Sequence, residues 1–153
     1  MQFTNSDSSI KNTVKIVFAI LAVSLSSSAF ANAASWAGFG GATITEQNVL
    51  EFPAGADSWA GFANTNNSLY PLNLSDGGTI TFTAAVSGSA SVRFRLERLA
   101  YPDVDPAFDT SSVTVTGTTE ATYSITIPNQ GENIYRSFIL YLNDRDTPVT
   151  IKN

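Results

Sequence analysis

The clearest structural signal in the chain is the run Thr79-Ile80-Thr81-Phe82-Thr83-Ala84-Ala85-Val86, in which apolar and hydroxyl side chains alternate. Successive side chains of a β-strand point to opposite faces, so this alternation is typical of a strand with one face in a core and the other in solvent. Thr, Ile, Phe and Val are also residue types that strands favour. The run therefore predicts a half-buried strand.

Similar runs extend from this segment in both directions. Strands are expected at 91–98, 113–116, 121–127, 135–143 and 149–151, and weaker ones at 42–45, 49–52, 58–63 and 69–72. The residues Gly117-Thr118-Thr119-Glu120 are expected to join their neighbours as a hairpin. No helical period follows residue 34. About nine short strands separated by turn residues predict an all-β fold, an antiparallel β-sandwich of jelly-roll type.

The first 33 residues have the pattern of a signal peptide. Lys11 and Lys15 precede the apolar run 16–25, and small residues follow up to Ala31 and Ala33. This order of regions is that of a cleaved leader, and the apolar run is shorter than the ~20 residues that a membrane-spanning helix needs. We therefore expect residues 1–33 to be a signal peptide and residues 34–153 to form one domain. That domain is expected to be secreted or periplasmic, with no membrane attachment after cleavage.

The composition excludes several kinds of chemistry and several partners. The 153 residues contain no His and no Cys, which excludes a Ser-His-Asp triad, a thiolate nucleophile and a conventional zinc site. The net charge of −5 disfavours nucleic acid and anionic membranes. A glycosidase needs two carboxylates flanking a cleft, and no acidic cluster on one strand indicates such a pair. We expect a protein that is not an enzyme.

The outward faces of the expected strands differ in composition. Most carry only small hydroxyl side chains. Three strands, at 58–63, 91–98 and 135–143, instead direct larger groups outward: Trp59, Arg93, Arg95, Glu97, Tyr141 and Asn143. Aromatic rings pack on the C–H faces of sugars, and charged or amide groups hydrogen-bond sugar hydroxyls. If the three strands share a sheet, these residues predict a carbohydrate-binding surface. In the alternative, Trp59 is a core residue and the charged trio is a solvated face.

A short repeat and an acidic loop need separate interpretation. The segment Ser-Trp-Ala-Gly-Phe occurs at 35–39 and again at 58–62, which we interpret as two strands with one packing solution. Asp103, Asp105 and Asp109 offer the oxygen ligands that Ca²⁺ prefers. Pro102 and Pro106 in this segment favour instead a rigid loop in which the carboxylates cap turns. A structural Ca²⁺ site is the alternative, and no other cofactor is expected.

Seven segments taken in order resemble a known family. They are Phe52–Gly55, Ser58–Asn64, Tyr70–Leu72, Gly77–Thr83, Val92–Arg95, Tyr101–Pro106 and Ser137–Leu142. Together they resemble the accessory carbohydrate-binding modules appended to laminarinase-type glycoside hydrolases of marine bacteria. The most specific segment is Tyr-Pro-Asp-Val-Asp-Pro at 101–106. The resemblance covers nearly all of residues 34–153 and implies a β-sandwich that binds β-1,3-glucan (laminarin).

The resemblance leads to an expectation about partners. No hydrolase domain accompanies the module, so we expect a free-standing polysaccharide-binding protein that works beside separate secreted glycoside hydrolases. Two alternatives remain open. One is an exported structural or adhesion domain that binds proteins through its sheet edges, and the other is a small glycan-active enzyme.

Overall fold

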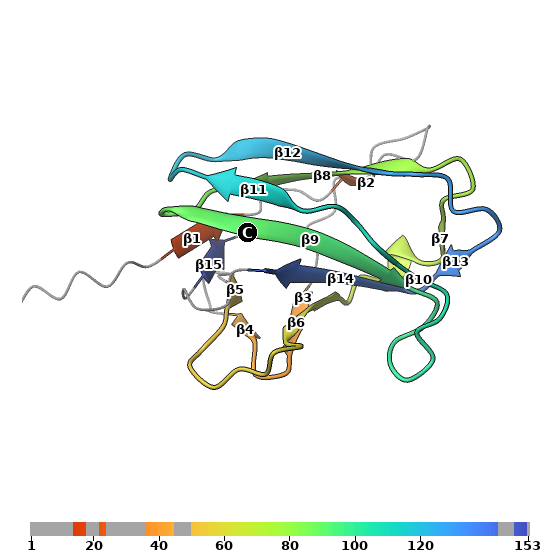
Figure 1. The fold of residues 1–153 in the computed structure, drawn as a ribbon, viewed down its shortest axis with the longest axis horizontal. Coiled ribbons are helices and arrows are strands. Elements are labelled where there is room, and N and C mark those ends of the chain that lie inside the picture. The colour runs from red at the N-terminus through yellow and green to blue at the C-terminus, as the bar shows by residue number, and fades with distance from the viewer. Residues whose placement is uncertain (1–13, 18–21, 24–35, 45–49, 144–148, 153) are drawn as a thin grey trace, which may run out of the picture.

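The computed structural model describes residues 14–17, 22–23, 36–44, 50–143 and 149–152, with side chains described for 36–44 and 50–143. The chain is an antiparallel β-sandwich of two layers (Figure 1), which confirms the expected all-β fold. Twelve strands lie within the stretches whose side chains are described, more than the nine expected. Residues 107–109 form a strand that was not expected, and the expected strand at 135–143 is divided into strands at 134–135 and 137–142.

The larger layer is a six-stranded sheet with the order β10-β9-β14-β6-β3, and β11 also pairs with β9. Two short strands therefore follow each other along one edge of β9, and Thr110 joins them by exchanging hydrogen bonds of 2.9 Å with the backbone of Phe94. The bounds are β3 (Trp36–Phe39), β6 (Gly61–Asn64), β9 (Ser89–Glu97), β10 (Ala107–Asp109), β11 (Val113–Thr116) and β14 (Ser137–Leu142).

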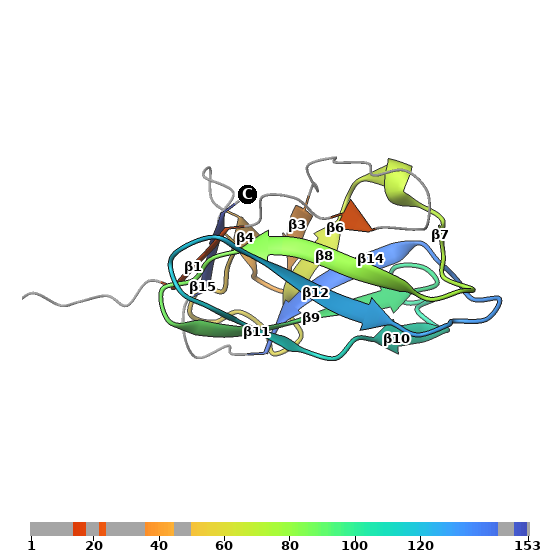
Figure 2. The ribbon, with the colours of Figure 1, turned by 90° about the horizontal axis from the view of Figure 1, so that it is seen from above.

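The smaller layer has the order β12-β8-β2, and its strands β8 and β12 lie over β9 and β14 (Figure 2). Its bounds are β2 (Ala22–Val23), β8 (Gly78–Ala84) and β12 (Ala121–Ile127). The expected hairpin of 113–116 with 121–127 is wrong, because β11 pairs with β9 and β12 pairs with β8. Residues 117–120 instead cross from one layer to the other, and Val115 and Ile125 are buried from opposite layers.

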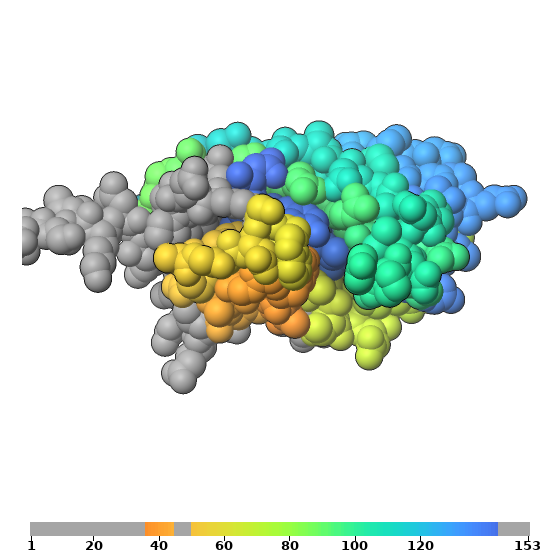
Figure 3. Space-filling model, turned by 60° about the horizontal axis from the view of Figure 1, so that its bottom comes forward, coloured from red at the N-terminus to blue at the C-terminus, as the bar shows by residue number. Residues whose placement is uncertain are grey.

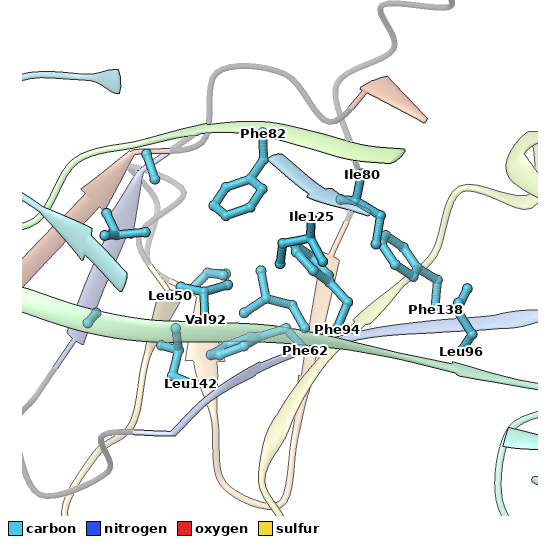
Figure 4. Packing of buried hydrophobic residues seen from close by; sticks show 14 of the residues in the cluster. Leu50, Phe62, Ile80, Phe82, Val92, Phe94, Leu96, Ile125, Phe138 and Leu142 are labelled. Atoms are coloured by element: carbon cyan, nitrogen blue, oxygen red, sulfur yellow. The ribbon is translucent and has the colours of Figure 1, made fainter. Parts of the chain in front are cut away.

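The alternating apolar side chains of both layers meet in one core (Figure 4). Ile80 and Phe82 of β8 enter it from one side, and Phe94 of β9 and Phe138 of β14 enter it from the other. All four are at most 1 % exposed. The Phe82 and Phe94 rings pack edge-on at 5.4 Å across the interface between the layers. The period-two pattern of the sequence thus fixes which side chains hold the layers together.

Shorter pairs close the ends of the sandwich. They are β4 (Thr43–Ile44) with β5 (Leu50–Glu51), β7 (Leu72–Asn73) with β13 (Ile134–Tyr135), and the parallel pair of β1 (Val14–Val17) with β15 (Val149–Lys152). A single turn of 3₁₀-helix spans Asn67–Leu69.

The predicted signal peptide is only partly within the described residues. The strands β1 and β2 belong to it, whereas its two candidate cleavage positions, Ala31 and Ala33, lie outside. In the described stretches, no helix has the length and apolar character that crossing a membrane requires.

Candidate functional site

The larger sheet brings together the three strands that carry the outward aromatic and charged residues. In its order, β9, β14 and β6 are direct neighbours. We call the side of this sheet that points away from the core the outer face. Trp59 is 59 % exposed, so the alternative that placed it in the core is wrong. It lies in the turn just before β6 rather than within a strand.

Three rings form a row across the outer face, which we call the aromatic row: Trp59, Phe39 and Tyr141. Phe39 of β3 stacks on Trp59 with ring centroids 6.1 Å apart and planes 14° apart. The ring of Tyr141 on β14 meets Phe39 edge-on, also at 6.1 Å. Phe39 was not among the predicted site residues. Its signal in the sequence was the first copy of the repeat, whose last residue it is.

Two glycines allow the row to close up. A Cβ at Gly61 would stand 2.8 Å from the Tyr141 ring and 2.9 Å from the Phe39 ring, so only a hydrogen fits between them. Gly40 has φ +64°, and a Cβ there would stand 2.9 Å from the Trp59 ring. Glycine is the residue that tolerates both the positive φ and the close approach. The glycines therefore determine how tightly the rings assemble.

The repeated segment is the origin of this arrangement, and our interpretation that both copies pack alike is wrong. The copies pair antiparallel, with Phe39 opposite Gly61. In the first copy, Trp36 packs toward the core against Phe138 at 5.8 Å, and Phe39 points outward. The second copy has the opposite phase, because its Phe62 is fully buried and its Trp59 is exposed. The same five-residue sequence thus supplies Trp36 and Phe62 to the core side of the sheet and Phe39 and Trp59 to its outer face.

A charged group continues directly from the aromatic row. Arg93 lies opposite Tyr141 in the β9–β14 register, and its guanidinium carbon stands 4.4 Å above the centre of that ring. Such a cation–π contact is favourable at exposed sites by about 0.5–1 kcal/mol. Asp109 of β10 lies opposite Arg95 and accepts from both arginines, with N–O distances of 2.5 Å. The rings and the ion pairs therefore form one continuous surface.

Glu97 was predicted to be an open group of the outer face, but the structure buries it. It is 6 % exposed, and both of its carboxylate oxygens are engaged. One oxygen accepts from Arg95 Nε at 2.8 Å and the other from Ser137 Oγ at 3.1 Å. The hydrogen bond with Glu97 is the main cause that raises the pKa of Arg95. Glu97 therefore orients Arg95 and does not offer itself to a ligand.

Asn143 has a similar supporting role. Its Oδ1 accepts from Arg93 Nε at 3.1 Å, and its Nδ2 donates to the hydroxyls of Ser91 and Ser112 at 3.0 and 2.8 Å. Although Asn143 is exposed, its amide oxygen and nitrogen both bond to other side chains, and Asn143 thereby holds the guanidinium of Arg93 over Tyr141. Asn143 was predicted as a contact residue, and the structure gives it a positioning role toward Arg93 as well.

The outer face is polar, but its charged side chains sum to no net charge. Two arginines are balanced by Asp109 and Glu97. In the described part of the chain, the Trp59 indole N–H and the Tyr141 hydroxyl have no hydrogen-bond partner. Burial, followed by the charge of Glu97, raises the pKa of Tyr141. Its hydroxyl therefore stays protonated at neutral pH and is both a donor and an acceptor for a ligand.

The three aspartates do not form the metal site that was the alternative in the sequence. Asp109 points to Arg93 and Arg95, and Asp103 faces Arg98 at 3.9 Å. Within the described stretches, no three acidic side chains gather where they could hold a metal ion. The reason is register, because pairing with β9 turns Asp109 onto the outer face while Asp103 and Asp105 stay in the loop.

The outer face is hollowed between two projecting segments. Figure 3 shows the yellow segment around residues 53–59 on one side and the teal segment around residues 98–106 on the other. The blue and green atoms of β14 and β9 lie between them. The strands that carry Tyr141, Arg93 and Arg95 therefore line a shallow groove, and Trp59 belongs to the segment on one side of it.

Comparison with protein-family models, curated proteins and solved structures finds no match to this chain.

Proposed function

We propose that the chain binds a polysaccharide, β-1,3-glucan, without cleaving it, through the outer face of the larger sheet. The observation that carries this proposal is the continuity of the surface. An exposed tryptophan at one end leads through Phe39 and Tyr141 into the pair of arginines held by Asp109.

The chemistry of this surface matches that of a sugar chain. A pyranose ring has C–H faces that pack on aromatic rings, and the exposed Trp59 offers such area. Its hydroxyls need directional donors and acceptors, which the guanidinium N–H groups, the Asp109 carboxylate and the Tyr141 hydroxyl supply. Because Glu97 and Asn143 hold the arginines in place, little side-chain entropy is lost when the ligand binds.

The state of the carboxylates supports binding without catalysis. A glycosidase needs one carboxylic acid that protonates the leaving oxygen and a second carboxylate as base or nucleophile. The carboxylates of Asp109 and Glu97, on strands β10 and β9 of this sheet, are both engaged by Arg95, and Glu97 is also buried. Their role here is to hold cations in position.

The proposal includes export and a separate enzyme partner. The leader pattern of residues 1–33 supports delivery to the periplasm or the medium. There the protein would hold glucan close to secreted glycoside hydrolases.

The experiment is affinity electrophoresis of the protein in gels containing laminarin, together with an assay for new reducing ends. Retardation with a Kd of order μM to mM is expected, because shallow polar sites gain only a few kcal/mol after ordering costs. No reducing ends should appear. Failure of every glucan to retard the protein would contradict binding and favour a protein-binding structural domain. Release of reducing ends by the purified protein would show that it is an enzyme.

A further inference from the structure

We propose that Tyr101 is a second stacking residue, and that the groove takes an internal run of several uncharged sugar units extending from Trp59 to Tyr101. This inference rests on the proposed function and adds the length and charge of the ligand. It also adds a residue that lies outside the aromatic row and its arginines.

The exposure of Tyr101 is the first observation. Its side chain is 88 % exposed, the largest value among the exposed large hydrophobic residues of the described chain. Its neighbour Leu99 is 41 % exposed. One exposed aromatic residue alone is ordinary on a protein surface. Its position and the way it is held are what make Tyr101 informative.

The loop that carries Tyr101 is tied at its base. Arg98 N–H donates to the carbonyls of Val104 and Pro106 at 3.0 and 3.1 Å, and Arg98 Nε donates to the carbonyl of Asp103 at 3.4 Å. These bonds close the loop onto the end of β9, where Glu97 pairs with Ala107. The exposed ring is thus carried by a segment with defined anchor points, which lowers the entropy cost of binding a ligand there.

The loop also stands in line with the other binding groups. Along β9 the order is Arg93, Arg95 and then the loop, while Tyr141 lies opposite Arg93 and the aromatic row continues from it to Trp59. Figure 3 shows the teal segment of this loop and the yellow segment that ends near Trp59 on opposite sides of the hollow. A ligand that contacts both sides must be a chain and not a single sugar.

Charge defines the class of chain. Asp103 and Asp105 are exposed on the same loop as Tyr101, and Arg98 faces Asp103 at 3.9 Å, so the loop carries one net negative charge. The arginines in the floor of the groove are already balanced by Asp109 and Glu97. A sulfated or uronic-acid polymer would therefore meet repulsion at the loop without a compensating positive field on the floor. The ligand that fits is uncharged.

The test is calorimetric titration with β-1,3-linked glucose oligosaccharides of increasing length and with laminarin. We expect the affinity of the unmodified protein to rise with length. Tyr101→Ala should bind the shortest oligosaccharides normally but bind long chains about tenfold more weakly, which is about 1.4 kcal/mol. Tyr101→Phe, which keeps the ring, should restore the loss. The matched control is Ile134→Ala, which removes another exposed apolar side chain, on β13.

The outcomes separate this inference from the proposed function. Unchanged long-chain affinity in Tyr101→Ala, or an equal loss at every length, would overturn the role of Tyr101 while glucan binding stands. Binding of a sulfated glucan as tightly as laminarin would overturn the assignment to uncharged chains. If the unmodified protein binds no oligosaccharide of any length, the proposed function fails, and this inference fails with it.

Discussion

At the residue scale, the outer face divides between side chains that meet solvent and side chains that hold them. Trp59 belongs to the first group and the buried Glu97 to the second, and Asn143 holds Arg93 although it is itself exposed. Alternation in the sequence assigned all three to one face and could not separate these roles. The difference depends on neighbours such as Ser137, which lies opposite Glu97 on β14.

The Arg95–Glu97 pair leads to a prediction about stability. Arg95→Ala leaves the buried Glu97 carboxylate with Ser137 as its remaining partner, and losing a charge-assisted hydrogen bond costs about 1.5–3 kcal/mol. We expect the free energy of unfolding in urea to fall by about that amount, together with glucan affinity. The double variant Arg95→Ala/Glu97→Gln should recover part of the stability, because it buries no unpaired charge. If Arg95→Ala is as stable as the unmodified protein, Glu97 does not depend on it.

Tyr70 gives a prediction about pH. Burial raises its pKa from 10.0 to about 12, and its hydroxyl donates to the Asn64 carbonyl at 3.1 Å. Between pH 10 and pH 12 the Tyr70 hydroxyl loses its proton in the unfolded chain but keeps it in the folded chain. The contribution of Tyr70 to the free energy of unfolding is therefore fully present below pH 10 and is lost as the pH rises toward 12. Chemical denaturation across this window should show falling stability. The decline should be smaller in Tyr70→Phe, and an identical decline in both proteins would refute the assignment.

At the element scale, the sequence predicts the long strands well, but it predicts the short strands and the strand neighbours poorly. The alternation in 79–86 and 91–98 identified β8 and β9 and their buried faces, because one face of each strand packs in the core. It could not predict that β11 and β12 lie in different layers, since both the hairpin and the crossover bury the same valines and isoleucines. That the two repeat copies pair with each other, and that Phe39 therefore joins the aromatic row, becomes visible only from the register of β3 and β6.

Gly61 allows that register to be tested. In Gly61→Ala, a methyl group would lie within 3 Å of the Tyr141 and Phe39 rings and must push them apart. Overpacking of this kind costs about 1–3 kcal/mol of stability, and we expect glucan affinity to fall about tenfold in the protein that folds. Ala37→Ser, an exposed position on the neighbouring strand β3, serves as the control and should bind normally. Unchanged affinity in Gly61→Ala would mean that ligand binding does not need the closed aromatic row.

At the scale of the whole molecule, the two layers present very different outer faces. The smaller sheet pairs Thr79 with Thr126 and Thr81 with Ser124, and its face is lined by short hydroxyl side chains. The larger sheet carries the rings and the ion pairs. The sandwich thus uses one sheet to cover the core and the other to present a groove.

Export is a prediction about the whole chain. Cleavage after Ala31 or Ala33 would remove β1 and β2 but none of the outer-face residues. We expect the intact mass of the protein recovered from an exporting host to lack about 31–33 residues. Glucan binding should be kept in this form. Recovery of periplasmic or extracellular protein that still begins at Met1 would contradict a cleaved leader.

The most direct measurement compares the unmodified protein with Trp59→Ala, recording both retardation in laminarin gels and the melting temperature. Because the Trp59 ring is 59 % exposed, its loss should remove little more than the stacking contact with Phe39, about 0.5–1.5 kcal/mol, and the melting temperature should change little. Retardation by laminarin should be abolished. A Trp59→Ala protein that is retarded as strongly as the unmodified one would contradict a glucan site on this face.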